Sequence, residues 1–149
     1  MSNATPEHRI IEIASVHAAA ERTPTTLHDP AVPEVLGTRL ATELRRFQPQ
    51  TVVLWSDLAT AVLGHVVARE LGAQVVYAFA DEGVLTLEGT MSAGEQVALI
   101  GYDWPTRPGL DALVRLVRNS GAVVAAVGSA LAAQHEEVPV VVLDPGVSR

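Results

Sequence analysis

The chain has 149 residues, of which 48% are hydrophobic and 18% charged, a balance typical of one soluble domain. Acidic residues outnumber basic ones by 17 to 10, and the net charge of −7 disfavours binding to a nucleic-acid backbone. The chain contains no Cys, which excludes disulfides, cysteine nucleophiles and zinc–thiolate sites. Every basic residue is Arg, which excludes a lysine base and a P-loop lysine as well.

Strand and helix patterns alternate along the chain. Runs of apolar residues predict strands at 10–16, 51–55, 74–79, 84–87, 96–100, 122–127 and 138–143. Apolar residues at helical spacing predict helices at 33–47, 59–71 and 110–119, and Gly72 and Gly121 end the last two. Because apolar strands alternate with helices, we expect an α/β fold whose mainly parallel sheet has helices on both faces. We expect one domain over 1–149, with an N-terminal strand and lead-in at 1–26 and a core at 27–145.

Membrane and secretion signals are not recognised in the sequence. The longest apolar stretch, residues 121–133, is shorter than the roughly 18 residues that a membrane-spanning helix needs. Residues 1–7 have neither the basic nor the apolar region of a secretory signal. We therefore expect a cytoplasmic protein that binds neither membranes nor nucleic acid.

The signatures of several enzyme and metal-site classes are also missing. The sequence has no GxSxG, GxGxxG or GxxxxGK[ST] motif, which disfavours the hydrolase, dinucleotide and P-loop classes. Its five histidines lack the spacing of metal ligands; they are His8, His17, His28, His65 and His135. We expect no metal site and interpret these histidines as surface or core residues.

The first candidate site is the junction between the strand at 51–55 and the helix at 59–71. Ser56 or Asp57 suits the N-cap of that helix, and the free N–H groups of a helix N-terminus attract anions. The alternative interpretation, given equal weight, is that Asp57 only caps the helix. A carboxylate at this position would also compete with a phosphate.

The second candidate site follows the strand at 96–100. Asp103 offers a carboxylate to a ribose diol or, through water, to Mg²⁺, while Thr106 and Arg107 offer donors to a phosphate. Such chemistry collects where strands of an α/β sheet end. The alternative is a rigid loop braced by proline, with Thr106 as the helix N-cap and Trp104 packed into the protein.

Four segments, in order, resemble the type I phosphoribosyltransferase family, most closely its orotate-type branch. They are Leu27–Pro30 with the helix that follows, the strand, loop and helix at 51–72, the Glu88–Val97 approach, and residues 97–128. The resemblance extends over residues 27–145 and implies that family's fold and a homodimer. In the family, two adjacent acids hold the ribose of phosphoribosyl diphosphate and a Thr- and Gly-rich loop binds its 5-phosphate.

The functional positions that the resemblance assigns depart from the family pattern. Tyr102 replaces the first acid and Asp103 keeps the second, and the loop that follows contains Thr106, Arg107 and Gly109. Pro108 removes a backbone donor from that loop.

Two further loops differ from those of the family. The diphosphate-loop equivalent, with Ser56, Asp57 and Thr60, has no Gly and gains a carboxylate. The catalytic-loop equivalent, residues 79–84, is short and acidic and lacks the family's Lys, Arg and His.

Together these departures predict a phosphoribosyltransferase-like protein without transferase activity. Donors aimed at a developing charge are typically worth about 3–4 kcal/mol each, so losing several removes most catalysis. We expect a nucleotide or phosphorylated ribose ligand in a regulatory or partner-binding role, with Mg²⁺ only when a sugar diphosphate is bound. Two alternatives remain open: an active enzyme of nucleotide metabolism that transfers phosphoribose from phosphoribosyl diphosphate to a nucleobase, and a structural subunit of an assembly.

Overall fold

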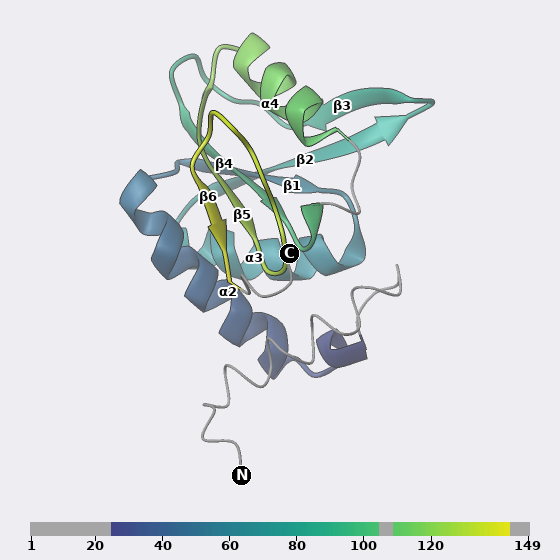
Figure 1. The fold of residues 1–149 in the computed structure, drawn as a ribbon, viewed down its shortest axis with the longest axis vertical. Coiled ribbons are helices and arrows are strands. Elements are labelled where there is room, and N and C mark those ends of the chain that lie inside the picture. Colours follow the sequence, from purple (N-terminus) through teal and green to yellow (C-terminus); the bar gives the residue numbers. More distant parts are fainter. Residues whose placement is uncertain (1–24, 105–108, 144–149) are drawn as a thin grey trace.

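A six-stranded sheet with helices on both faces organises the computed structural model, which describes residues 25–104 and 109–143 (Figure 1). The strands are β1 (Thr51–Trp55), β2 (Gln74–Asp81), β3 (Val84–Glu88), β4 (Gln96–Gly101), β5 (Val123–Ser129) and β6 (Val140–Val142). The helices are α2 (Ala31–Leu44), α3 (Leu58–Leu71) and α4 (Leu110–Asn119), with 3-10 turns η1 (Thr25–His28) and η2 (Arg45–Phe47). The strand expected at 10–16 lies outside the described residues.

The sheet has the order β3-β2-β1-β4-β5-β6, and only the β2–β3 pair is antiparallel. From β1 the chain adds β2 and β3 on one side, then crosses to the other side of β1 to form β4. The predicted mainly parallel α/β fold is thereby confirmed. Parallel sheets bind ligands where the order reverses in this way, outside the carboxyl ends of the two central strands.

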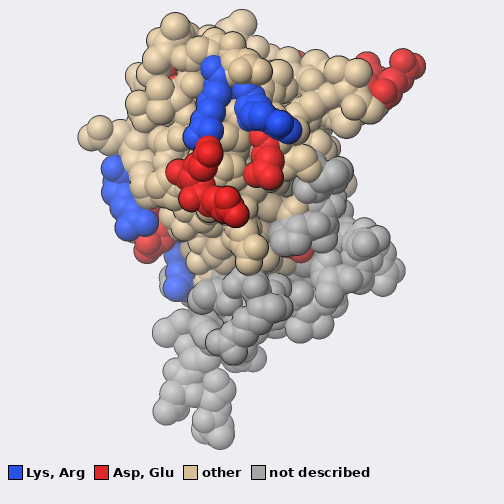
Figure 2. Space-filling model, turned by 45° about the horizontal axis from the view of Figure 1, so that its top comes forward, with Lys and Arg blue, Asp and Glu red and all other residues tan. Residues whose placement is uncertain are grey.

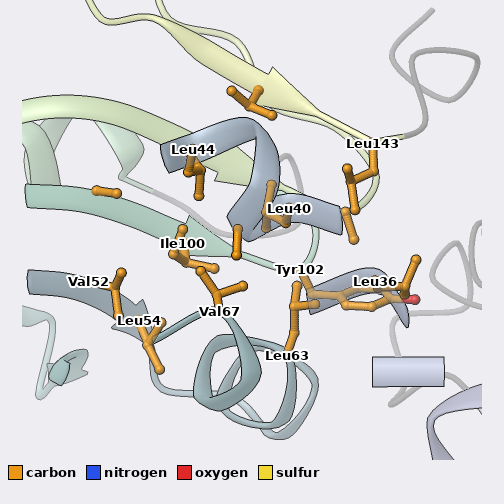
Figure 3. Packing of buried hydrophobic residues seen from close by; sticks show 14 of the residues in the cluster. Leu36, Leu40, Leu44, Val52, Leu54, Leu63, Val67, Ile100, Tyr102 and Leu143 are labelled. Atoms are coloured by element: carbon orange, nitrogen blue, oxygen red, sulfur yellow. The ribbon is translucent and has the colours of Figure 1, made fainter. Parts of the chain in front are cut away.

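Each face of the sheet has its own core. Helices α2 and α3 cover one face, where Leu36, Leu40 and Leu63 pack with alternate residues of the central strands (Figure 3). Helix α4 covers the other face through its apolar stripe, Leu113, Val114 and Val117. Because both faces are covered, the central strands are apolar throughout, which explains their continuous runs in the sequence.

Several boundaries differ from the sequence prediction. Strand β2 extends two residues further, to Asp81, because Glu82 and Gly83 both adopt positive φ and close a tight hairpin with β3. Strand β6 is shorter than the predicted 138–143. The N-cap position of α4 is Gly109, with φ of 89°, and not Thr106 as expected; Thr106 itself lies outside the described residues.

Within residues 25–104 and 109–143, no helix combines the length and the hydropathy required to cross a lipid bilayer.

Candidate functional site

The two candidate junctions meet at the middle of the sheet. Strands β1 and β4 are neighbours, with Leu54 paired to Ile100, so both chains leave the sheet at adjacent carboxyl ends. This is the point where the strand order reverses, the usual ligand position in an open α/β sheet. The topology therefore places the residues expected to bind diphosphate and ribose side by side.

At the first junction, Asp57 is the N-cap of α3. Its carboxylate accepts hydrogen bonds from the backbone N–H of Thr60 (2.8 Å) and from the Thr60 hydroxyl (3.0 Å). Asp57 is thus confirmed as the helix N-cap, while the anion site at this junction stays a prediction. Ser56 is exposed, and its N–H donates to the carbonyl oxygen of Ala78 on β2. The helix N-terminus that would receive an anion already holds a carboxylate of its own chain.

A buried hydroxyl links the two junctions. The Thr60 side chain is fully buried, and its oxygen accepts a hydrogen bond from the backbone N–H of Tyr102 (3.0 Å) while its proton goes to Asp57. The chain of hydrogen bonds runs from the end of β4 through α3 to the loop after β1. The structure therefore joins Asp57 and Thr60 of the first candidate site to Tyr102 of the second through hydrogen bonds.

The Tyr102 side chain points into the core. It lies with Leu36 and Leu63 between α2 and α3 and is only 3% exposed (Figure 3). Burial, and secondarily the charge of Asp103, raises the pKa of the phenol well above its usual range. Among the described residues, its hydroxyl has no hydrogen-bond partner. The residue that the resemblance aligns with the first ribose-binding acid is thus packed in the core.

Trp104 enters the core on the opposite face of the sheet. Its ring packs on Gly101, where an added Cβ would lie 2.7 Å from the indole, and its Nε1 donates to the carbonyl oxygen of Gly128 (3.1 Å). At 2% exposure it belongs to the core beneath α4. The expectation that Trp104 packs into the protein is confirmed, and it explains why residue 101 is Gly.

Ser129, at the end of β5, was not singled out from the sequence. It is fully buried, and its hydroxyl lies 3.1 Å from the Tyr102 carbonyl oxygen and 2.9 Å from that of Ala132. It also accepts the N–H of Leu131. Ser129 therefore holds the loop after β5 against the loop after β4. A lone Ser closing an apolar strand is the one signal that could have indicated this.

Asp103 and Gly109 remain as described residues of the second junction. Asp103 is half-buried between the two inward-pointing aromatic residues, and Gly109 begins α4 with no cap from the side chain of a described residue. Thr106 and Arg107, expected to bind phosphate, lie outside the described residues.

Charged side chains gather elsewhere, around a groove of about 740 Å³ between α4 and residues 134–137 (Figure 2). There the side chain of His135 is only 7% exposed, and its Nδ1 accepts hydrogen bonds from two backbone N–H groups. Its Nε2 lies 3.1 Å from Oδ1 of Asp111. Arg118 bonds to Glu137 and lowers the pKa of that carboxyl. His135 thus fixes a turn, and no group of three metal-ligating side chains occurs in the part of the chain that the structure describes.

Comparison with known proteins gives one curated relative by sequence. The chain is 31% identical over 102 residues to the orotate phosphoribosyltransferase of Thermotoga maritima, covering 67% of this chain and 54% of that protein. The chain thus spans about half the length of this relative. No family model matches.

Solved structures share the fold at low sequence identity. The adenine phosphoribosyltransferase of Trypanosoma brucei, in complex with AMP, pyrophosphate and ribose-5-phosphate, aligns with a TM-score of 0.71 and 16% identity, covering all of this chain and 84% of that one. The adenine phosphoribosyltransferase of Rhodothermus marinus aligns with a TM-score of 0.68 and 15% identity, covering 78% and 81%.

Proposed function

We propose that the chain, which is similar in sequence to an orotate phosphoribosyltransferase and shares the fold of adenine phosphoribosyltransferases, binds a nucleotide or a phosphorylated ribose without transferring phosphoribose. The observation that carries the proposal is the Asp57 cap, which fills the N-terminus of α3 with a carboxylate at the position equivalent to the diphosphate loop. A diphosphate group there would meet a negative charge in place of backbone donors. The role is regulatory or partner-binding.

The second junction supports loss of transfer together with retained binding. Of the two family acids only Asp103 remains, since Tyr102 lies in the core. Fixed donors aimed at the leaving group are usually the largest source of rate enhancement, and this chain has no Lys to supply one. Asp103, Thr106, Arg107 and the N–H groups that follow Gly109 are the residues we propose for ribose and phosphate. We expect Mg²⁺ to bind only together with a sugar diphosphate.

Calorimetric titration tests the binding half of this proposal. The ligands are AMP, ribose 5-phosphate and phosphoribosyl diphosphate, the last with and without Mg²⁺. Removing the guanidinium in Arg107→Ala should weaken binding about tenfold or more, since a charged hydrogen bond contributes about 1.5–3 kcal/mol. Arg115→Ala, an exposed Arg on α4 in the charged groove, is the matched control and should bind as the original chain does. Absence of heat with every ligand would overturn the binding proposal.

Diphosphate release tests the catalytic half. The chain is incubated with phosphoribosyl diphosphate, Mg²⁺ and a panel of purine and pyrimidine bases, and we expect release at the rate without protein. Release above that rate favours the second candidate, an active phosphoribosyltransferase of nucleotide metabolism. This candidate is supported by the adenine phosphoribosyltransferases whose fold the chain shares.

Two broader properties complete the proposal. We propose a homodimer, as the family resemblance implies, to be tested by light scattering; a monomeric mass at tens of micromolar would contradict it. We also propose a cytoplasmic location, where nucleotides and phosphorylated ribose are made, to be tested by cell fractionation.

A further inference from the structure

An apolar groove runs between α2 and α3 on the outer surface of the helical layer. It encloses about 510 Å³ and has Glu34 and His65 among its lining residues. Its remaining lining is apolar: Leu27, Pro30, Pro33, Ala61, Val62 and Val66. We call this feature the α2–α3 groove.

The apolar surface continues from the groove along α3. Val62 is 40% exposed, and Leu58, one helical turn earlier on the same side, is 68% exposed. Glu34 is paired with Arg69 across the two helices, so the charge on this rim is already balanced. Together with the groove, the Leu58 and Val62 side chains form a contiguous apolar surface, which is a feature of sites where another segment binds.

The chain itself supplies a segment of matching chemistry. Residues 1–24 precede the described part, which begins at Thr25 in η1, and Leu27 of η1 lines the groove. Within these residues the most apolar run is Ile10–Val16, Ile-Ile-Glu-Ile-Ala-Ser-Val. The connection from Val16 to Leu27 can span up to about 36 Å, and because Leu27 itself lines the groove, the segment can reach it.

We propose that residues 10–16 bind the α2–α3 groove of their own chain through their isoleucine and valine side chains. A short tether gives such a segment an effective concentration of about millimolar, well above that of a free partner at micromolar concentration. The segment is uncharged except for Glu12, which suits a groove whose only acid is already paired.

Because the chain has no Cys, a pair of introduced cysteines tests this contact without background. The full chain carries Ile13→Cys and Val62→Cys, and the control carries Ile13→Cys and Val123→Cys, where Val123 is 43% exposed on β5. A disulfide requires the Cα atoms to approach within about 7 Å. We expect the first pair to form an intramolecular disulfide about tenfold faster than the control, measured by non-reducing mass spectrometry. Equal rates overturn the proposal, and so do covalent dimers as the main product.

A second measurement needs no cysteine. Ile11→Ser combined with Ile13→Ser should release the segment and raise the fluorescence of a dye that binds apolar surfaces about twofold or more, because the groove becomes open. Ala18→Ser combined with Ala19→Ser, in the same N-terminal region, is the matched control and should leave the signal unchanged. Unchanged circular dichroism verifies the fold of each variant, and equal dye signals in both variants contradict the proposal.

Discussion

The two strand-to-helix junctions at the middle of the sheet begin alike and end differently. After β1 only Ser56 and Asp57 precede α3, and the Asp57 carboxylate binds the helix N-terminus directly. After β4 the chain takes residues 102–109 to reach α4, whose N-cap is Gly109 and which receives no cap from a described side chain. The first connection caps its helix with its own side chain, whereas no described side chain caps the N–H groups at the start of α4.

The long connection also uses its extra residues to stabilise the sheet. Tyr102 enters the core between α2 and α3, and Trp104 enters the core beneath α4, so the end of β4 is anchored on both faces. At the first junction a carboxylate thus occupies the helix N-terminus, whereas at the second no described side chain caps α4. Any remaining affinity for a phosphate is expected at the second junction.

Trp104→Ala should have the largest effect. It removes a buried indole, its packing on Gly101 and its hydrogen bond to Gly128, at an expected cost of about 3–5 kcal/mol in the free energy of unfolding. Denaturant unfolding measures the loss. Tyr77→Ala, an aromatic that is 38% exposed on β2, is the control and should cost much less. Equal losses would show that the second junction is not anchored by Trp104.

Thr60→Val should have the next largest effect, because it separates the two junctions. The variant keeps the side-chain shape but leaves the N–H of Tyr102 without its acceptor, at a cost of about 1–3 kcal/mol. The control is Thr42→Val, whose exposed hydroxyl only returns to the Thr38 carbonyl oxygen. Unfolding midpoints in urea that shift equally for both variants would contradict an energetic link between the junctions.

The sheet was largely predictable from the sequence because its strands are buried on both faces. Continuous runs such as Thr51–Trp55 need no tertiary information, and Gly72 marks the end of α3 by its left-handed conformation. The end of β2 was misplaced because the Glu82–Gly83 turn extends the hairpin with polar residues, which carry no strand signal.

The location of the candidate site in the fold was predictable from the sequence, whereas the hydrogen bonds within it were not. Asp57, Thr60 and Tyr102 were named from two separate segments, and the topology brings them together. Two contacts depend on which residues meet across strands. Thr60 joins the two segments, and Ser129 holds the loop after β5. Local patterns do not contain that information, because hydrogen bonds between residues 42 or 27 positions apart follow only from the folded sheet.

Asp57→Asn should change ligand affinity more than stability. Asn caps a helix about as well as Asp, so the free energy of unfolding should fall by only a few tenths of a kcal/mol. Removing a negative charge from the N-terminus of α3 should raise the affinity for phosphoribosyl diphosphate up to about fivefold, as measured by calorimetry. Glu43→Gln, an exposed acid on α2, removes the same charge and should leave the affinity unchanged. Weaker binding by the Asn variant would mean that Asp57 contacts the ligand favourably, and that the first junction is still a binding site.

Tyr102→Phe should have a small effect at neutral pH and a distinct effect at alkaline pH. The phenol hydroxyl is buried with no partner among the described residues, so its removal should raise the free energy of unfolding by up to about 1 kcal/mol at pH 7.

Burial raises the pKa of Tyr102 in the folded state above its unfolded value of about 10. Above about pH 10 the Tyr102 phenol ionises in the unfolded chain but stays protonated in the folded chain. The free energy of unfolding therefore falls as the pH rises further. In the Phe variant this contribution disappears, and the loss of stability between pH 10 and 12, followed by urea unfolding, should become shallower. An unchanged slope would mean that the phenol is hydrated in solution, and the anchoring of the second junction would then rest on Trp104 alone.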